Sequence, residues 1–287
     1  MSIHITRLVD WPFRIAVIAS LAVTGCAHVG PPAGQVDAVA AAVAPPPSTQ
    51  PEVGEAVLAA FAPRQVSEAG EVVLRYRLLS PTTQPAGEKF PLVIFLHGSG
   101  ERGEDNYRQL IHGGKEFLHH SKRHPAFYVF PQCPKGTWWS TSNKLRTEAN
   151  PAAAAPPMEK IVDLIDRMVR TEAIDPGRIY VAGLSMGGFG TYELVGLQPK
   201  RFAAAIPMCG GGNLEIVPKY RSTPFWLFHG DADTAVNVRY SRDMAAAMKR
   251  AGVSHIYTEY PGGNHNAWTP TLTNDAVIDW MFAQRRK

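Results

Sequence analysis

The sequence predicts an α/β fold with a mostly parallel central sheet and helices on both of its faces. Three observations lead to this prediction. Segments with strand character alternate with segments of helical periodicity from about residue 64 onward. Most strand segments are apolar at every position, as strands covered on both faces are. Polar, glycine-containing motifs follow several strands, and functional groups gather beyond the carboxyl ends of strands in such sheets.

The predicted elements can be placed in order along the chain. An alternating strand comes first, and further strands follow at intervals: 71–79, 91–98, 126–132, 178–183, 202–209, 224–230 and 255–262. Helices are predicted where apolar residues recur every three to four positions and where a glycine ends the pattern: 158–171, from the strand end at 183 to Gly196, 241–252, and about 275–284.

The N-terminus reads as an export signal. Arg7 and Arg14 precede the apolar run 15–23, which is too short to span a bilayer. The VTGC sequence that follows resembles a bacterial lipobox, whose cysteine would be Cys26. That resemblance implies a membrane anchor of acyl chains on Cys26, and Ala27 after it implies sorting to the outer membrane of a Gram-negative bacterium. The alternative is a plain secretory signal with an incidental cysteine.

Composition divides the chain into three segments. A signal peptide is expected at 1–25, and a tether rich in Ala and Pro at 26–63, since such composition does not build a core. The folded α/β domain is expected at 64–287.

Charge and cysteine content exclude other classes of protein. The formal net charge is only +4 and the basic residues form no long run, so no nucleic-acid partner is expected. Three cysteines in 287 residues do not make a disulfide framework. Cys133 and Cys209 could pair in an oxidising compartment, but we favour two separate buried thiols.

The GLSMGG segment carries the candidate nucleophile. It places Ser185 in the pattern Gly183-x-Ser-x-Gly187, directly after a predicted strand and at the start of a predicted helix. Such a turn is so tight that side chains two residues before and after the serine would collide. The helix N-terminus behind the serine stabilises negative charge, and the Met186 backbone N–H is expected to point into an oxyanion hole.

A serine hydroxyl needs a base and an acid, and their order along the chain narrows the candidates. Among the later histidines, His265 lies in the glycine-rich PGGNHNAW loop after the final strand and is the expected base. The FHGDADTAV segment offers two acids, and we favour Asp233 over Asp231, which is better placed to bond turn N–H groups.

The HGSGERG segment after strand 91–98 is expected to complete the oxyanion hole. Its glycines formally match a dinucleotide fingerprint, but no acidic residue ends the next strand and no second βα unit is evident. An His-Gly-x sequence at this place supplies the second oxyanion donor in many esterases. By that resemblance the Ser99 backbone N–H pairs with that of Met186.

Six motifs together resemble one group of enzymes. HGSGERG, PQCPKGTWWS, RIYVAGLSMGG, PMCGGG, HGDADTAV and PGGNHNAW look like the bacterial esterases related to feruloyl and acetyl-xylan esterases, polyhydroxyalkanoate depolymerases and dienelactone hydrolases. The resemblance covers about residues 70–287. It implies the α/β-hydrolase fold and hydrolysis of carboxylic esters through an acyl-enzyme, without a cofactor.

Two further sequence features bear on ligands. Trp138, Trp139 and Trp268 lie in loops next to these motifs and could form a platform for a sugar ring or an aryl acid, or could simply pack. The histidine-rich segment 119–124 is expected to be a basic helix end and not a metal site, because no carboxylate or thiolate beside it completes a site.

The expected function is therefore that of a serine esterase acting outside the cytoplasm on acylated polysaccharide or small esters. A serine peptidase of the prolyl-oligopeptidase type shares the order of the three residues but usually carries a large extra domain. A non-catalytic lipoprotein that binds glycans or partners is the third hypothesis, and the complete set of motifs weighs against it.

Overall fold

The computed structural model describes residues 52–140 and 157–286. Contacts divide the chain into two units, Met1–Ser48 and Thr49–Lys287, and all described residues belong to the second. The predicted signal peptide, Cys26 and most of the predicted tether therefore lie outside the described residues.

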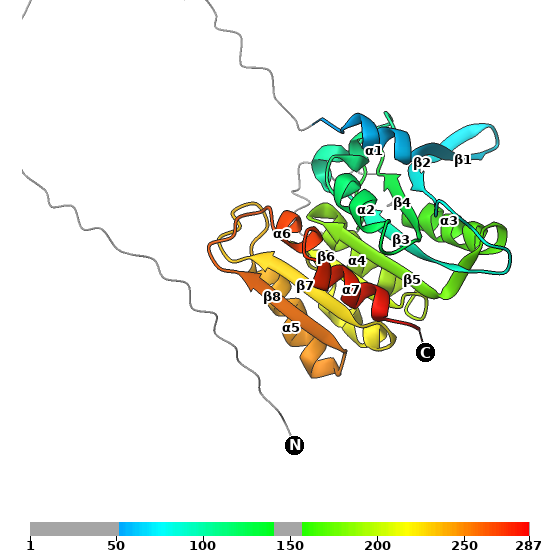
Figure 1. Cartoon of the computed structure of the whole chain (residues 1–287). Coiled ribbons are helices and arrows are strands. Elements are labelled where there is room, and N and C mark those ends of the chain that lie inside the picture. The colour runs from blue at the N-terminus through cyan, green and yellow to red at the C-terminus, as the bar shows by residue number, and fades with distance from the viewer. Residues whose placement is uncertain (1–51, 141–156, 287) are drawn as a thin grey trace, which may run out of the picture. The chain divides into compact units, whose positions relative to one another are not determined.

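The described residues form one eight-stranded sheet (Figure 1). Its order is β1-β2-β4-β3-β5-β6-β7-β8. The first two strands are antiparallel to each other and β2 is antiparallel to β4, whereas every pair from β4 to β8 is parallel. The strands are β1 (Ala62–Glu68), β2 (Glu71–Leu79), β3 (Phe90–Leu96), β4 (Phe127–Gln132), β5 (Ile174–Leu184), β6 (Ala204–Met208), β7 (Phe225–Gly230) and β8 (His255–Tyr260).

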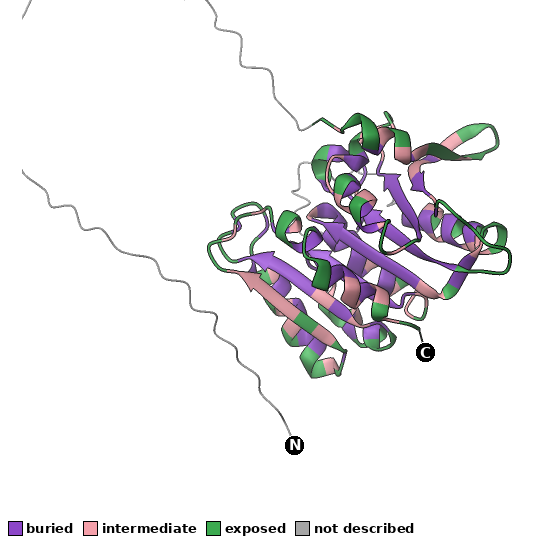
Figure 2. Cartoon of the chain, in the orientation of Figure 1, coloured by how far each residue is buried: buried purple, intermediate pink, exposed green. Residues whose placement is uncertain are grey.

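Helices cover both faces of the sheet. They are α1 (Glu55–Ala60), α2 (Gly114–His120), α3 (Met158–Thr171), α4 (Met186–Leu197), α5 (Arg239–Ala251), α6 (Trp268–Leu272) and α7 (Asp275–Ala283), with short 3-10 segments η1 (Ser99–Glu101), η2 (Arg108–Leu110) and η3 (Leu214–Ser222). One core cluster joins α3, α4 and α5 to alternate residues of the strands, and the other joins α1, α2, α6 and α7 to the remaining ones. The central strands are accordingly buried along their length (Figure 2).

The predicted α/β fold is confirmed, and the structure adds elements that the sequence pattern did not indicate. Strand β2 and helix α3 have the predicted bounds, 71–79 and 158–171. The later strands and helices agree to within a few residues. Not predicted were α1, β1, α6 and the 3-10 segments, and of α2 only its basic end was predicted.

The folded unit begins earlier than residue 64, which corrects the predicted boundary. Helix α1 lies within the segment assigned to the tether. Phe61 is completely buried and meets the ring of Phe130 edge-on, with centroids 5.1 Å apart. Val57 is also buried. These apolar residues join the core beside β4, so residues 55–63 belong to the domain.

A smaller prediction concerns the cysteines. Cys133 and Cys209 are both buried and unpaired, as favoured above. Burial raises the pKa of each thiol to about 12. Among the described residues, none of the helices has the length and apolar character that a bilayer span requires.

Candidate active site

The parallel strands bring the predicted site residues to one edge of the sheet. Ser185 follows β5, Asp233 follows β7 by three residues, and His265 lies in the loop after β8. All three strands point the same way, so their carboxyl ends meet at that edge.

Ser185 occupies a strained turn between β5 and α4. Its backbone has φ 53° and ψ −116°, a conformation that residues with a side chain rarely adopt. Its N–H donates to the Met208 carbonyl at the end of β6, 2.9 Å away. The turn is thus fixed to the neighbouring strand, and it lifts the serine side chain off the sheet at the start of a helix.

The two glycines of the motif are required by close backbone contacts. A Cβ atom on Gly183 would lie 2.3 Å from the carbonyl oxygen of Gly187. A Cβ atom on Gly187 would lie 1.9 Å from the carbonyl oxygen of Leu96 in β3. Any side chain at either position would force the turn apart.

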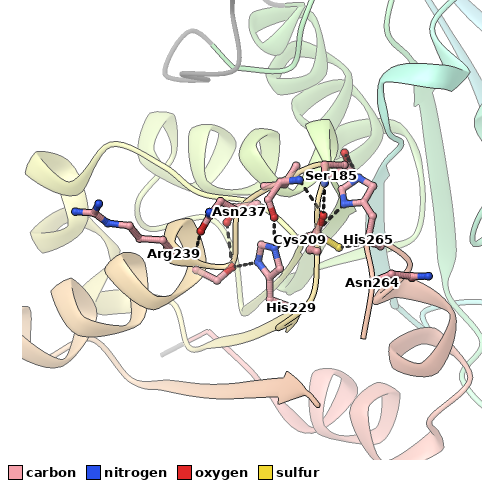
Figure 3. Close-up of polar contacts among 12 residues, drawn as sticks. Ser185, Cys209, His229, Asn237, Arg239, Asn264 and His265 are labelled. Atoms are coloured by element: carbon pink, nitrogen blue, oxygen red, sulfur yellow. Dashed lines mark hydrogen bonds and ion pairs between the residues drawn. The ribbon is translucent and has the colours of Figure 1, made fainter. Parts of the chain in front are cut away.

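Hydrogen bonds join the serine, the histidine and the second acid in a row (Figure 3). His265 Nε2 lies 2.9 Å from Ser185 Oγ, and His265 Nδ1 lies 2.7 Å from Asp233 Oδ2. A carboxylate only accepts, so Nδ1 carries the proton and Nε2 presents a lone pair to the serine hydroxyl. The arrangement can take the hydroxyl proton as the oxygen attacks.

The other acid and the other histidines lie elsewhere. Asp231 is exposed, and its Oδ1 accepts a hydrogen bond from the Gly262 N–H at 2.7 Å, the turn-binding use that the sequence favoured. His255 Nδ1 bonds the Val253 carbonyl. His229, at the end of β7, is buried beside Asp233 and contributes a contact that sequence reasoning did not foresee.

Asp233 is held as a carboxylate. Its side chain is completely buried, which by itself raises its pKa. Hydrogen bonds from His265 and from the backbone N–H groups of Val236 and Ala235 outweigh burial, so the pKa lies below its ordinary value. The acid is therefore ionised wherever the neutral imidazole can act as a base.

The predicted oxyanion donors begin two adjacent helical segments. Met186 is the first residue of α4 and Ser99 the first of η1. A Cβ atom built on Gly98 would lie 3.8 Å from the Ser185 Cβ, which places the Gly98–Ser99 segment beside the nucleophile. Backbone N–H groups at two helical starts are a suitable pair of donors for a developing oxyanion.

His97 fixes this loop, a role that the sequence did not reveal. Its ring is completely buried, its Nε2 accepts from the Cys133 N–H at 2.9 Å, and its Nδ1 therefore donates to the Gly98 carbonyl at 2.6 Å. Burial lowers the pKa of His97 to about 4, so the ring stays neutral. His97 is the first residue of the HGSGERG motif, but only the structure identifies Cys133 and Gly98 as its hydrogen-bond partners.

Trp139 is not a substrate platform, which corrects one prediction. It is completely buried, and its Nε1 donates to the His97 carbonyl at 3.0 Å. Trp139 thus anchors the end of β3 below the oxyanion loop.

The other two tryptophans are only partly buried and lie near the site. The Trp138 ring lies under the guanidinium of Arg102, 4.8 Å from the ring centroid. The Trp268 ring meets the His265 ring edge-on, with centroids 5.4 Å apart. Trp268 therefore packs against the catalytic imidazole.

A polar groove of about 720 Å³ adjoins the oxyanion loop. Its lining includes Ser99, Arg102, Asp105, Arg108 and Lys135.

The histidine-rich segment ends α2, as predicted, but a carboxylate does lie beside it. His120 Nδ1 is 3.6 Å from Asp275 Oδ1, and His120 Nε2 bonds the Leu272 carbonyl. The same carboxylate is paired with Arg123 at 3.2 Å. Arg123 is thus already paired with the Asp275 carboxylate that a metal ion would need as a ligand.

Comparison with known proteins gives one family and several relatives. The family described as phospholipase/carboxylesterase matches residues 80–276. Acyl-protein thioesterase 1 of Neurospora crassa is 28% identical over 213 residues, which cover 66% of this chain and 84% of that protein. The bifunctional acetylxylan esterase/xylanase of Neocallimastix patriciarum is 28% identical over 190 residues, or 63% of this chain and 26% of that protein.

Solved structures with a similar fold include two esterases. The crystal structure of a thermostable esterase is 35% identical and superposes with a TM-score of 0.74, covering 80% of this chain and 64% of that one. The chain thus spans less than two thirds of that esterase's length. A ferulic acid esterase, 15% identical with a TM-score of 0.60 and covering 77% of this chain and 97% of that one, shares the fold.

Proposed function

Because the chain belongs to the phospholipase/carboxylesterase family of α/β-hydrolases, we propose that it hydrolyses carboxylic esters outside the cytoplasm with Ser185 as its nucleophile. The observation that carries this proposal is the row of hydrogen bonds from Ser185 Oγ through the His265 ring to Asp233, 2.9 and 2.7 Å long.

The reaction follows from this geometry. Ser185 Oγ attacks the ester carbonyl while His265 Nε2 takes its proton, and Asp233 stabilises the imidazolium that forms. The N–H groups of Ser99 and Met186 stabilise the oxyanion. The imidazolium then protonates the departing alcohol and leaves an acyl group on the serine. Water, deprotonated by the same imidazole, releases the acid.

Acyl groups on polysaccharide or small hydrophilic esters are the proposed substrates. The acetylxylan esterase/xylanase relative and the resemblance to polysaccharide esterases favour this class. The polar groove beside Ser99 and the half-buried Trp268 beside His265 would receive a sugar better than a lipid. The thioesterase relative makes a thioester the natural second substrate to test.

Ser185→Ala tests the nucleophile. We expect hydrolysis of p-nitrophenyl acetate to fall to background, with an unchanged thermal unfolding transition, because the side chain is small and lies in a partly exposed turn. Turnover retained in the folded variant would contradict the assignment of Ser185.

A substrate panel tests the class. Acetyl, butyryl, long-chain and feruloyl esters, acetylated xylan, an acyl thioester and a peptide amide would be compared by kcat/KM. Highest values for short acyl groups on a sugar are expected, and a preference for the peptide amide would favour the peptidase hypothesis.

The N-terminus carries the proposal on location. The apolar run 15–23 followed by VTGC supports export and acylation at Cys26. Replacing Cys26 by Ser is expected to move the protein from the membrane fraction to the soluble exported fraction without loss of kcat. An unchanged membrane fraction would contradict the lipid anchor.

A further inference from the structure

A second imidazole contacts the carboxylate that orients His265. His229, the fifth residue of β7 and labelled in Figure 3, is completely buried. Its Nε2 lies 3.2 Å from Asp233 Oδ2. We propose that His229, as a neutral ring protonated at Nε2, is a positioning residue that holds Asp233 in place for His265. This inference rests on the function proposed above.

The contacts of Nε2 determine where the proton sits. Besides Asp233, Nε2 faces the carbonyl oxygen of Val236 at 2.9 Å. Both neighbours are acceptors, and a bare ring nitrogen would place its lone pair against two oxygens. Nε2 therefore carries a proton, which it donates to the Val236 carbonyl while facing the carboxylate.

Ser241 faces the opposite nitrogen of the ring. Its Oγ lies 2.7 Å from His229 Nδ1 and 3.0 Å from the Gly210 carbonyl. A hydroxyl can donate to either neighbour or accept from Nδ1, so Ser241 is compatible with either state of that nitrogen. The two acceptors at Nε2, the Val236 carbonyl and Asp233, therefore determine the tautomer.

With this proton the acid is fully bonded. Asp233 Oδ1 accepts from the N–H groups of Ala235 and Val236 at 2.8 and 2.9 Å, and Oδ2 receives His265 and His229. Three hydrogen bonds and the nearby N–H of His229 thus surround the carboxylate. Removing His229 would leave Oδ2 with one donor fewer and free the carboxylate to rotate away from His265.

Burial favours the neutral ring of His229, although the charges around it act in both directions. Asp233 attracts a proton to it, His265 opposes one, and Glu259 of the neighbouring strand is already paired with Arg242 at 2.6 Å. Burial has the largest influence and lowers the pKa of His229. A cation at this position would oppose the imidazolium that forms on His265 during the reaction.

Kinetics of three variants test the proposal. His229→Leu is expected to lower kcat by about 10- to 100-fold with KM changed less than about twofold. The acid limb of kcat/KM should move to lower pH, because a carboxylate that is free to rotate away from His265 stabilises the imidazolium less. His229→Gln, whose amide can reach Asp233, should recover most of kcat, and His255→Gln is the matched control.

The outcomes separate positioning from a packing role and from the proposed function. Folded His229→Leu with unchanged kcat and acid limb would overturn the proposal, whatever its melting temperature. The ring ¹H–¹⁵N spectrum of the full chain at pH 7.5, assigned with His229→Gln, needs no substrate. It should show a neutral ring protonated at Nε2, and an Nδ1-protonated ring or an imidazolium would overturn the proposal. Failure of Ser185→Ala to abolish hydrolysis would instead contradict the proposed function.

Discussion

At the scale of single residues, the site is a set of hydrogen-bond choices between similar side chains. Asp231 and Asp233 are two positions apart, yet one bonds an exposed turn and the other bonds the imidazole. The sequence could rank them because a carboxylate directly after a glycine turn tends to bond turn N–H groups. It could not foresee that His229 also reaches Asp233, because that contact depends on the fold.

The two acids give a matched pair of variants. Asp233→Asn is expected to lower kcat about 10³- to 10⁴-fold, since the amide cannot hold the imidazole in its active tautomer. Asp231→Asn should stay within about threefold of wild type, because its partner is a turn N–H. Initial rates on p-nitrophenyl acetate measure both, and a larger loss for Asp231→Asn would reverse the assignment.

At the scale of elements, motifs flanked by glycine were predictable and their supports were not. The turn at Ser185 could be predicted from local sequence, because close backbone contacts leave no room for a side chain at positions 183 and 187, and both are glycine. The loop after β3 is different. Its shape depends on His97 bonding Cys133 and on Trp139 bonding His97, contacts between segments 36 and 42 residues apart. No local pattern encodes such pairs.

The turn at Ser185 has a direct stability test. Gly187→Ala is expected to cost about 3 kcal/mol or more of the free energy of unfolding, or to prevent folding, because the new Cβ would lie 1.9 Å from the Leu96 carbonyl oxygen. Gly54→Ala is the control, since nothing lies within 4 Å of its Cβ position. Urea denaturation compares them, and equal stabilities would contradict the packing described here.

The loop after β3 predicts a pH-dependent stability. In the unfolded chain His97 becomes protonated below its ordinary pKa of 6.5, whereas in the folded protein burial lowers that pKa to about 4. Stability therefore falls as pH falls through this window, by about 2 kcal/mol between pH 7.5 and 5.0 for this one group. The His97→Asn variant should be less stable at pH 7.5, but its free energy of unfolding should fall by about 2 kcal/mol less between pH 7.5 and 5.0. Denaturation at both pH values measures this loss, and an equal loss in variant and wild type would contradict the account.

At the scale of the whole molecule, the family's segment carries the chemistry and the N-terminal elements extend the sheet. The family match begins at residue 80, so α1, β1 and β2 precede it. Composition alone misassigned residues 55–63 to the tether, because alanines and prolines surround the few apolar side chains that matter. β1 has little alternation of its own, and pairing with β2 determines it.

Phe61 tests where the folded unit begins. Phe61→Ala is expected to cost about 3–5 kcal/mol, since its ring is completely buried against Phe130. Leu197→Ala, at a side chain 48% exposed, should cost less than about 1 kcal/mol. Chemical denaturation of the full chain measures the free energy of unfolding of both variants. If Phe61→Ala is as stable as Leu197→Ala, Phe61 is not a core residue and the folded unit begins after it.

The inert state of Cys133 and Cys209 has a consequence for where this protein can be made. Thiolates, not thiols, exchange with oxidants and with other cysteines, and both groups stay protonated inside the core. The native domain therefore needs neither an isomerase nor a reducing agent. Expression in a reducing cytoplasm and export to an oxidising compartment should yield domains with the same melting temperature and the same two slowly alkylated cysteines.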